Sequence, residues 1–417
     1  MKYGLIAQRL GHSYSAEIHH RLFDYAYDLR ELPPEDLADF MRQRAFNAIN
    51  VTIPYKEAVI PYLDEISETA RLVGAVNTVV NRDGKLVGYN TDFLGLRDLI
   101  LRSGIEVENK KVLILGSGGT SKTATAVAKH MGCAMAVRVS RTAKEDCITY
   151  EQAADLHKDA QIFINTTPCG MFPHLGEAAV DLSAYPSVHG VIDVIYNPLR
   201  SRLVCDAIER GIPAVGGLYM LVAQAAYAAE QFVGKTVNAE RIETIYRELL
   251  TDKLNIVLVG MPCCGKSTVG KRLATTLGMD FVDVDEEIVR QDGRSISNIF
   301  AEAGESGFRD IEQRVIRDLS ARRHTVIATG GGAVLREENT RLLRENGRIY
   351  FIDRPLEDLV ATDDRPLSSN RADLERRYRE RYDIYCTACD CHVRSNNVIE
   401  DTIRRIKEDF ENEIVSA

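Results

Sequence analysis

The sequence lacks the features that mark membrane, secreted and nucleic-acid-binding proteins. Its 417 residues contain no apolar run of spanning length, and the longest candidate, residues 217–234, is interrupted by Gln224, Glu230 and Gln231. The first 15 residues hold too short an apolar stretch for a signal peptide. Acidic residues outnumber basic ones, 61 to 52, for a formal charge of −9, which argues against nucleic acid or anionic membrane as a partner. We therefore expect a cytoplasmic protein with small-molecule partners, whose oligomeric state the sequence leaves open.

Metal-binding clusters and flexible linkers are also missing. The nine cysteines of such a chain are expected to be free thiols. Cys386, Cys389, Cys391 and His392 resemble zinc ligands in spacing, but no second pair lies nearby to complete a tetrahedral site. A strand carrying small apolar thiols is the favoured interpretation. Residues 247–253 have no Gly/Ser- or Pro-rich character, which predicts a close, semi-rigid connection.

Two glycine loops with different patterns are present instead. KVLILGSGGTSKTA, residues 111–124, reads as an apolar strand, a glycine turn and a helix start, the layout of a dinucleotide site. NIVLVGMPCCGKST, residues 255–268, matches the G-x-x-x-x-G-K-[ST] pattern directly after another strand. The first loop implies hydride transfer and the second implies phosphoryl transfer. The chain is therefore interpreted as two enzymes in series.

The alternation of apolar and amphipathic segments predicts an α/β protein of two or three domains. From residue 111 the alternation is strict, as in a doubly wound parallel sheet, and the amphipathic run 218–233 is expected to return to the first domain. The predicted strands are 4–7, 48–52, 78–81, 112–115, 136–139, 162–165, 191–194 and 326–329. The predicted domains are 1–102 with a returning helix 218–248, 103–217, and 253–417.

The segment after the second strand of the dinucleotide unit favours NADP over NAD. NAD sites usually carry an acidic residue there, to bind the ribose 2′-hydroxyl. This chain has Ser140, Arg141 and Thr142, with Lys144 close by, and an arginine can neutralise a 2′-phosphate. The remaining predicted cofactor residues are those of the glycine loop: Gly116, Ser117, Gly118, Gly119 and Thr120.

Six short motifs show that residues 1 to about 248 resemble the shikimate dehydrogenase family. They are GHSYS (11–15), NVTIPYK (50–56), GAVNT (74–78), YNTD (89–92), NTTPCGM (165–171) and MLVAQAA (220–226). The resemblance implies an α/β substrate domain followed by a Rossmann-type NADP domain. It also implies reduction of a ketone with NADPH.

The same resemblance implies roles for individual residues. Reduction by hydride requires a proton donor beside the nascent alkoxide. Lys56 is expected to be this acid/base and Asp92 its partner, with the sharing of the proton left open. Taken alone, Lys56 would be read as a surface residue and Asp92 as a cap of the helix 93–102. The expected substrate-binding residues are Ser13, Ser15, Thr52, Asn77, Tyr196 and Gln224.

From about residue 253 to the end, the chain resembles shikimate kinase, a P-loop phosphotransferase with a parallel sheet. Lys266 is expected to reach the β/γ-phosphates of ATP, and Ser267 to ligate Mg²⁺. Asp283 and Asp285 are predicted to share one face of a strand. By resemblance Asp283 helps to place Mg²⁺, and Asp285 accepts the proton of the attacking hydroxyl or orients it. The remaining nucleotide residues are Met261, Cys263, Cys264, Gly265 and Thr268.

Arginines and glycines complete the implied kinase site. Arg309 and Arg381 match the family's carboxylate clamps, and Arg365 falls in the expected lid. The triplet Gly330, Gly331 and Gly332 is expected to let the backbone approach the substrate ring. The segment 360–365 is short and lacks the usual upstream arginine. The other arginines of this charged region, Arg376, Arg377 and Arg379, are expected to be solvated.

The sequence thus predicts a bifunctional enzyme that reduces 3-dehydroshikimate with NADPH and then phosphorylates shikimate with Mg·ATP. The nearest alternative is a quinate/shikimate dehydrogenase with a weak or degenerate kinase domain, because Cys263 and Cys264 stand where smaller P-loop residues are usual. A non-catalytic sensor built from the same domains is the alternative from another class. Lys56, Asp92, Lys266 and Asp285 argue against that alternative.

Overall fold

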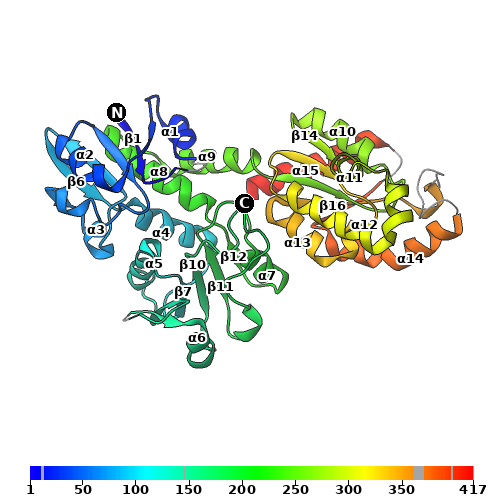
Figure 1. The fold of residues 1–417 in the computed structure, drawn as a ribbon, viewed down its shortest axis with the longest axis horizontal. Helices are drawn as coiled ribbons and strands as arrows, with labels where there is room; N and C mark the ends of the chain where they lie inside the picture. Colours follow the sequence, from blue (N-terminus) through cyan, green and yellow to red (C-terminus); the bar gives the residue numbers. More distant parts are fainter. Residues whose placement is uncertain (11–13, 145, 360–370, 396–397, 417) are drawn as a thin grey trace. The chain divides into compact units, whose positions relative to one another are not determined.

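The computed structural model describes residues 1–10, 14–144, 146–359, 371–395 and 398–416. It groups them into two compact units. Unit 1 is Met1–Met171, Glu177–Asn197 and Leu203–Glu248, and unit 2 is Phe172–Gly176, Pro198–Arg202 and Leu249–Ala417. Both units are α/β structures (Figure 1), which confirms the predicted fold class. The finer division of unit 1 near residue 102 stays a prediction. Ser13 and Arg365 lie outside the described residues.

The first sheet of unit 1 is mixed and has the strand order β2-β1-β3-β5-β6-β4. Strands β1, β2 and β3 are parallel, and β5 runs antiparallel to β3 and β6. The elements are β1 (Tyr3–Ala7), β2 (Asp28–Glu31), β3 (Ala48–Val51), β4 (Glu65–Ile66), β5 (Thr78–Arg82) and β6 (Lys85–Tyr89), with α1 (Ser15–Leu22), α2 (Leu37–Gln43) and α3 (Glu68–Val73). The predicted strands in this part are confirmed. Their side chains Ile6, Ile49 and Val79 are fully buried.

The second sheet of unit 1 is parallel throughout, in the order β12-β11-β10-β7-β8-β9. Its elements are β7 (Lys111–Leu115), β8 (Met135–Ser140), β9 (Ile148–Thr149), β10 (Ile162–Asn165), β11 (Gly190–Asp193) and β12 (Ala214–Val215), with α5 (Gly119–His130), α6 (Tyr150–Leu156) and α7 (Arg202–Glu209). The four strands predicted for this part are confirmed. Because carboxyl ends of parallel strands meet at one edge, the glycine loop after β7 and Arg141 after β8 lie at the same edge.

Helices α4 (Thr91–Ser103), α8 (Leu218–Val233) and most of α9 (Ala239–Thr251) complete unit 1, which ends at Glu248. The predicted helix 218–233 is confirmed, and it packs closely on α4. A Cβ added to Gly95 would lie 2.8 Å from the carbonyl oxygen of Met220, so only glycine allows this approach. Arg102 on α4 makes two hydrogen bonds to Glu243 on α9, of 3.0 and 3.1 Å.

Unit 2 has a five-stranded parallel sheet in the order β14-β15-β13-β16-β17. Its elements are β13 (Asn255–Val259), β14 (Asp280–Asp283), β15 (Thr325–Ala328), β16 (Gly347–Asp353) and β17 (Cys391–Arg394), with α10 (Lys266–Leu277), α11 (Val284–Asp292), α12 (Ile296–Ser320), α13 (Glu337–Asn346), α14 (Arg371–Ala388) and α15 (Ile399–Ser416). The strand predicted over 326–329 is confirmed as β15. Strand β13 is central and leads directly into the P-loop.

One sequence expectation for unit 2 is wrong. Asp283 and Asp285 do not share a strand, because β14 ends at Asp283 and α11 begins at Val284. The Asp283 carboxylate caps this helix: its Oδ1 accepts the N–H of Asp285 at 2.9 Å and that of Glu286 at 3.4 Å. Satisfying these N–H groups favours ending the strand there.

Neither a membrane span nor a metal cluster is found among the described residues. No helix there is both long and apolar enough to cross a bilayer. No set of three or more His, Cys, Asp or Glu side chains in those ranges is arranged to hold a metal ion. Cys386 lies in α14 rather than in the expected strand, whereas Cys391 begins β17. His392 Nε2 lies 2.8 Å from Asp353 Oδ2.

Candidate active sites

In unit 1, Lys56 and Asp92 form a direct ion pair. Lys56 Nζ lies 2.5 Å from Asp92 Oδ2, with the two side chains 18% and 11% exposed. Asp92 lies in the first turn of α4, where the helix dipole favours a carboxylate. The cap of this helix is Asn90, whose side chain accepts the N–H of Phe93 at 3.0 Å, so Asp92 is not required as the cap. The carbonyl of Lys56 accepts the N–H of Val76 at 2.8 Å, which fixes the lysine backbone.

Asn77 is buried beside this pair and bonded within the protein. Its Oδ1 accepts the N–H of Thr91 at 2.8 Å, and its Nδ2 donates to Thr91 Oγ1 at 3.0 Å. Because Thr91 directly precedes Asp92, Asn77 holds the start of α4 in place. The amide of Asn77 keeps one further N–H for a ligand.

Other predicted substrate residues of unit 1 lie on two helices, on a loop and after a strand. Ser15 begins α1, next to Tyr14, whose ring meets the ring of Tyr196 edge-on with centroids 5.7 Å apart. Gln224 lies on α8, where its backbone N–H would be 3.0 Å from a Cβ at Gly95 of α4. Thr52 is half-buried at the end of β3. The structure thus assembles Lys56, Asp92 and Asn77 tightly, with Ser15, Tyr196 and Gln224 on the neighbouring helices and loop.

Sequence reasoning missed a buried layer behind this site. Tyr27 donates to Asn50 Oδ1 at 2.7 Å, and Asn50 Nδ2 donates to Thr78 Oγ1 at 3.1 Å. The ring of His19 stacks on Tyr27, and its Nδ1 lies 2.5 Å from the Tyr25 hydroxyl. Burial lowers the pKa of His19 to about 3, so the ring is neutral, and its tautomer decides which partner donates in this hydrogen bond. Asn50 begins the motif NVTIPYK (50–56), whereas nothing in the sequence singles out Tyr27.

The glycine loop of unit 1 has the geometry of a pyrophosphate site. Gly116 has φ 121°, and a Cβ there would lie 2.5 Å from Thr166 Oγ1. No atom lies within 4 Å of a Cβ added to Gly118 or Gly119, which leaves room for a ligand against the backbone. Helix α5 begins at Gly119, so its free N–H groups and positive dipole end face this space. The residues present therefore fit a dinucleotide, with Thr120 in the first turn.

Basic side chains flank the same loop. Arg141 is exposed just after β8, and Ser140 Oγ donates to the carbonyl of Thr142. Lys144 Nζ donates to Ser117 Oγ at 3.1 Å, which brings a second cation to the loop. Two cations at this edge suit a 2′-phosphate. On the other side, Lys122 of α5 lies 2.7 Å from Glu57, the residue after Lys56, and so links α5 to the segment that carries Lys56.

In unit 2, the P-loop residues Met261, Cys263, Cys264, Gly265 and Thr268 surround the amino end of α10. Lys266 is 6% exposed, and its Nζ donates to the carbonyls of Gly260 and Met261, both at 2.9 Å. Cys263 has φ 65°, a left-handed conformation that favours glycine. Cys264 Sγ lies 3.8 Å from Lys266 Nζ. The loop is therefore formed, with a strained cysteine within it.

Oxygen ligands suited to Mg²⁺ lie next to this loop. Ser267 Oγ donates to Asp283 Oδ2 at 2.5 Å, so a hydroxyl and a carboxylate converge. Mg²⁺ in nucleotide sites is held by few protein ligands plus phosphate oxygens and water, and this pair fits that pattern. Asp285 lies across from the glycine triplet, where a Cβ at Gly330 would be 2.8 Å from its Oδ1.

The glycine triplet and the arginines form the opposite wall of this site. A Cβ at Gly332 would lie 2.0 Å from Arg309 Nη2, and Arg381 Nη1 donates to the carbonyl of Gly331 at 3.2 Å. Arg309 Nη1 pairs with Glu312 at 2.6 Å. Burial raises the pKa of Glu312, against the opposing effect of Arg309. The structure thus brings Arg309, Arg381 and the glycines together.

The expectation that Arg376, Arg377 and Arg379 are all solvated is wrong for one of them. Arg376 and Arg379 are exposed, but Arg377 is partly buried and its Nε has no hydrogen-bond partner. Arg377 lies one helical turn before Arg381, on the same face of α14. Burial and the charge of Arg381 lower the pKa of Arg377.

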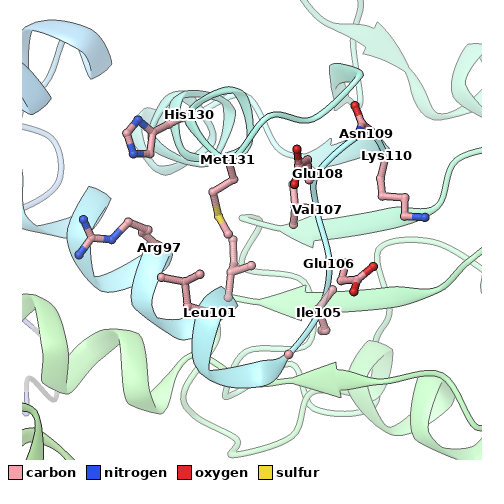
Figure 2. Close-up of a pocket in the computed structure, with 12 residues that line it drawn as sticks. Arg97, Leu101, Ile105, Glu106, Val107, Glu108, Asn109, Lys110, His130 and Met131 are labelled. Carbon is pink, nitrogen blue, oxygen red and sulfur yellow. The ribbon is translucent and has the colours of Figure 1, made fainter.

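A separate pocket of about 820 Å³ lies in unit 1 (Figure 2). Arg97 and Leu101 of α4, His130 at the end of α5, Met131 after it, and the segment 104–110 line it. This segment precedes β7, so the pocket lies at the opposite end of that strand from Gly116. None of the predicted site residues lines it.

The chain is similar to known proteins in both parts. Residues 5–79 match the shikimate dehydrogenase substrate-binding domain, and residues 262–411 match the shikimate kinase family. Shikimate dehydrogenase (NADP(+)) of Clostridium perfringens strain SM101 is 34% identical over 265 residues, which cover 59% of this chain and 97% of that protein.

Solved structures show the same likeness for the first part. A chorismate mutase/shikimate 5-dehydrogenase fusion protein from Clostridium acetobutylicum is 34% identical, with a TM-score of 0.56, covering 59% of this chain and 96% of that one. Shikimate 5-dehydrogenase from Thermus thermophilus, solved with NADP(H) and shikimate, is 26% identical, with a TM-score of 0.53, covering 60% of this chain and 99% of that one.

Proposed function

The chain belongs to the shikimate dehydrogenase family and carries a shikimate kinase domain, and we propose that the two activities act in sequence. Unit 1 reduces 3-dehydroshikimate to shikimate with NADPH. Unit 2 phosphorylates the 3-hydroxyl of shikimate with Mg·ATP. We further propose three domains, 1–102 with the returning helix, 103–217, and 253–417.

In the proposed reduction, Lys56 and Asp92 handle the proton. When bound, NADPH supplies the hydride to the ketone carbon. Lys56 Nζ gives a proton to the oxygen that becomes the alcohol, while Asp92, 2.5 Å away, holds the ammonium in place and stabilises its charge. Ser13, Ser15, Thr52, Asn77, Tyr196 and Gln224 orient the hydroxyls and the carboxylate of the substrate. Gly116–Thr120, Ser140, Arg141 and Thr142 hold the cofactor.

In the proposed phosphorylation, positioning and charge carry most of the effect. When bound, Mg·ATP supplies the transferable phosphoryl group, with Ser267 and Asp283 as metal ligands. Lys266 turns from the carbonyls of its own loop to the phosphates. Asp285 accepts the proton of the attacking hydroxyl. Arg309, Arg381 and the triplet Gly330–Gly332 hold the shikimate, and Arg365, expected by resemblance to reach the transferred group, lies outside the described residues.

The observation that supports the sequential proposal best is that each unit contains its own set of reactive groups. The Lys56–Asp92 ion pair lies in unit 1, and the Ser267–Asp283 pair lies beside Lys266 in unit 2. The product of the first reaction carries the hydroxyl and carboxylate that the second site requires.

The order of the two reactions is tested with 3-dehydroshikimate as the sole substrate. With Mg·ATP alone, no ADP should form; adding NADPH should start NADPH oxidation and then ADP release. Lys56→Met should abolish both signals from 3-dehydroshikimate, yet leave ADP release from added shikimate intact. ADP release from 3-dehydroshikimate without NADPH would contradict the proposed order.

Cofactor choice separates the proposal from the alternative of a quinate/shikimate dehydrogenase with a weak kinase. Arg141 and Lys144 beside the glycine loop favour a 2′-phosphate. Oxidation of shikimate should therefore be faster with NADP⁺ than with NAD⁺ at equal concentration. A clear NAD⁺ preference, together with negligible ADP release, would support the alternative.

A further inference from the structure

We propose that Arg377 is a third guanidinium of the carboxylate site in unit 2 and helps to select an acidic substrate for the kinase. The proposal rests on shikimate phosphorylation as the function of this unit. It concerns a residue that the sequence pattern assigned to the solvent and that the structure brings to the wall formed by Arg309 and Arg381.

Arg377 lies on α14 in line with Arg381 and Tyr385. Residues Arg377, Arg381 and Tyr385 are spaced four apart and form one stripe along the helix. Tyr385 is fully buried, and its hydroxyl donates to the carbonyl of Gly331, which also accepts from Arg381 at 3.2 Å. The stripe therefore runs from the glycine triplet toward the amino end of α14, with Arg377 next in line.

Arg377 has charged neighbours on both α14 and α12. The groups that act on its charge are Arg381, Arg376 and Asp373 of α14 and Glu305 of α12. Glu305 is also a partner of Arg309, at 3.3 Å from its Nη2. Arg377 and Arg309 thus share an acidic neighbour on α12, which places both near the same end of the site.

Arg377 and Arg381 carry positive charge that no carboxylate of the described residues neutralises by direct contact. Within the described ranges, neither Arg377 nor Arg381 forms an ion pair, and Arg377 Nε is buried without a hydrogen-bond partner. Arg309 Nε is also buried without a partner, although its terminal nitrogens meet Glu305 and Glu312. Like charges four residues apart on a helix repel each other, and buried donors without partners destabilise the protein. A carboxylate bound between these side chains would relieve both effects.

The neighbouring arginines provide matched controls. Arg379 is exposed, and Arg376 pairs with Asp373 at 2.8 Å on the outer side of the helix. Substitution of Arg379 changes the charge of α14 by the same amount without touching the stripe. The dehydrogenase activity of the same chain reports whether each variant is intact in unit 1, and circular dichroism reports the helix content.

The test compares Arg377→Leu, Arg377→Lys and Arg379→Leu with the parent protein, using shikimate and its uncharged carboxamide as kinase substrates. Arg377→Leu should raise KM for shikimate about tenfold, with KM for ATP unchanged and kcat within about twofold. The carboxamide should be phosphorylated poorly by all forms, with no further loss in Arg377→Leu. Arg377→Lys should fall between the two, and Arg379→Leu should match the parent.

Two results would overturn the inference: an unchanged KM for shikimate in Arg377→Leu, or equal losses for shikimate and the carboxamide. An equal loss in Arg379→Leu would also overturn it, because the effect would then be one of general charge. Failure of the parent protein to phosphorylate shikimate would instead defeat the proposed kinase function, so the two failures are distinguishable.

Discussion

The two units hold their reactive charges in opposite ways. In unit 1 the ammonium of Lys56 is neutralised by Asp92 within a mostly buried pair. In unit 2 the ammonium of Lys266 meets backbone carbonyls and the thiol of Cys264, and Arg377 and Arg381 form no ion pair within the described ranges. A carboxylate beside an ammonium holds it in place and stabilises its charge, whereas a phosphoryl-transfer site needs cations that a polyanion can bind. The difference in pairing agrees with the two proposed reactions, although Arg309 of unit 2 is itself paired with Glu312.

The largest expected effect comes from removing each ammonium in turn. Lys56→Met should lower the dehydrogenase kcat about a thousandfold, the range of general acid catalysis, and leave the kinase unchanged. Lys266→Met should lower the kinase kcat by a similar or larger factor and leave the dehydrogenase unchanged. Separate NADPH and ADP assays on each variant measure this. Loss of both activities in either variant would show that the two sites are not independent.

The next largest effect concerns Gly95 and Gly332, each of which lies close to atoms of another element. In Gly95→Ala the new Cβ meets backbone atoms of α8, so helices α4 and α8 must separate, and unit 1 should lose about 2 kcal/mol of stability. In Gly332→Ala the Cβ meets the end of the flexible Arg309 side chain, which should swing away. KM for shikimate in the kinase assay should then rise about tenfold.

Thermal denaturation of both glycine variants provides the control. Gly95→Ala should lower the midpoint of unit 1, followed through dehydrogenase activity, and Gly332→Ala should leave that midpoint near that of the parent. A stable Gly95→Ala protein with full activity would show that α4 and α8 are not packed as closely as described.

A pH-dependent effect is expected from His19. Its pKa in the folded chain, about 3, lies below its ordinary value of 6.5, so between these values the unfolded state binds more protons. The stability contribution is fully present above pH 6.5 and is lost as the pH falls toward 3. At pH 5 unit 1 should be less stable than at pH 7.5 by roughly 2 kcal/mol from this residue.

The measurement is the urea midpoint of unfolding at each pH, followed by circular dichroism in the parent and the variants. His19→Phe should reduce the pH dependence, and His20→Phe, at an exposed neighbour, should not. An identical pH dependence in His19→Phe and the parent would show that His19 is not the responsible group.

The smallest effect concerns the strained P-loop cysteine. Cys263 has a left-handed backbone conformation, in which its Cβ causes strain. Cys263→Gly removes this Cβ and should stabilise unit 2 by about 1 kcal/mol. KM for ATP should stay the same or fall. Cys264→Ala, at a residue without this strain, serves as the comparison. A destabilised Cys263→Gly protein would contradict the assignment of strain.

The sequence allowed most of the fold to be predicted, because strand and helix periods are local properties. The strands around β7 and β13 and the helix α8 were accessible in this way, and the short motifs linked Lys56 to Asp92. The expected strand sharing of Asp283 and Asp285 failed because alternation alone does not reveal that Asp283 caps α11.

Other site features depended on tertiary packing. The charged composition around Arg377 predicts a solvated side chain. Its spacing of four residues from Arg381, however, places both arginines on one face of a helix. Tyr27 and His19 carried no sequence signal, since their role arises only when His19 of α1 stacks on Tyr27, which precedes β2 and donates to Asn50 of β3. Local patterns therefore located the reactive groups, and packing decided which neighbours support them.

One kind of molecule, shikimate, is proposed to bind at two separate sites of this chain. Calorimetric titration of the protein with shikimate, in the presence of NADP⁺ and a non-hydrolysable ATP analogue with Mg²⁺, tests it most directly. We predict two sites per chain, of which Gln224→Ala weakens one and Arg381→Ala weakens the other. A single site in the parent protein, or one site weakened by both variants, would contradict the account.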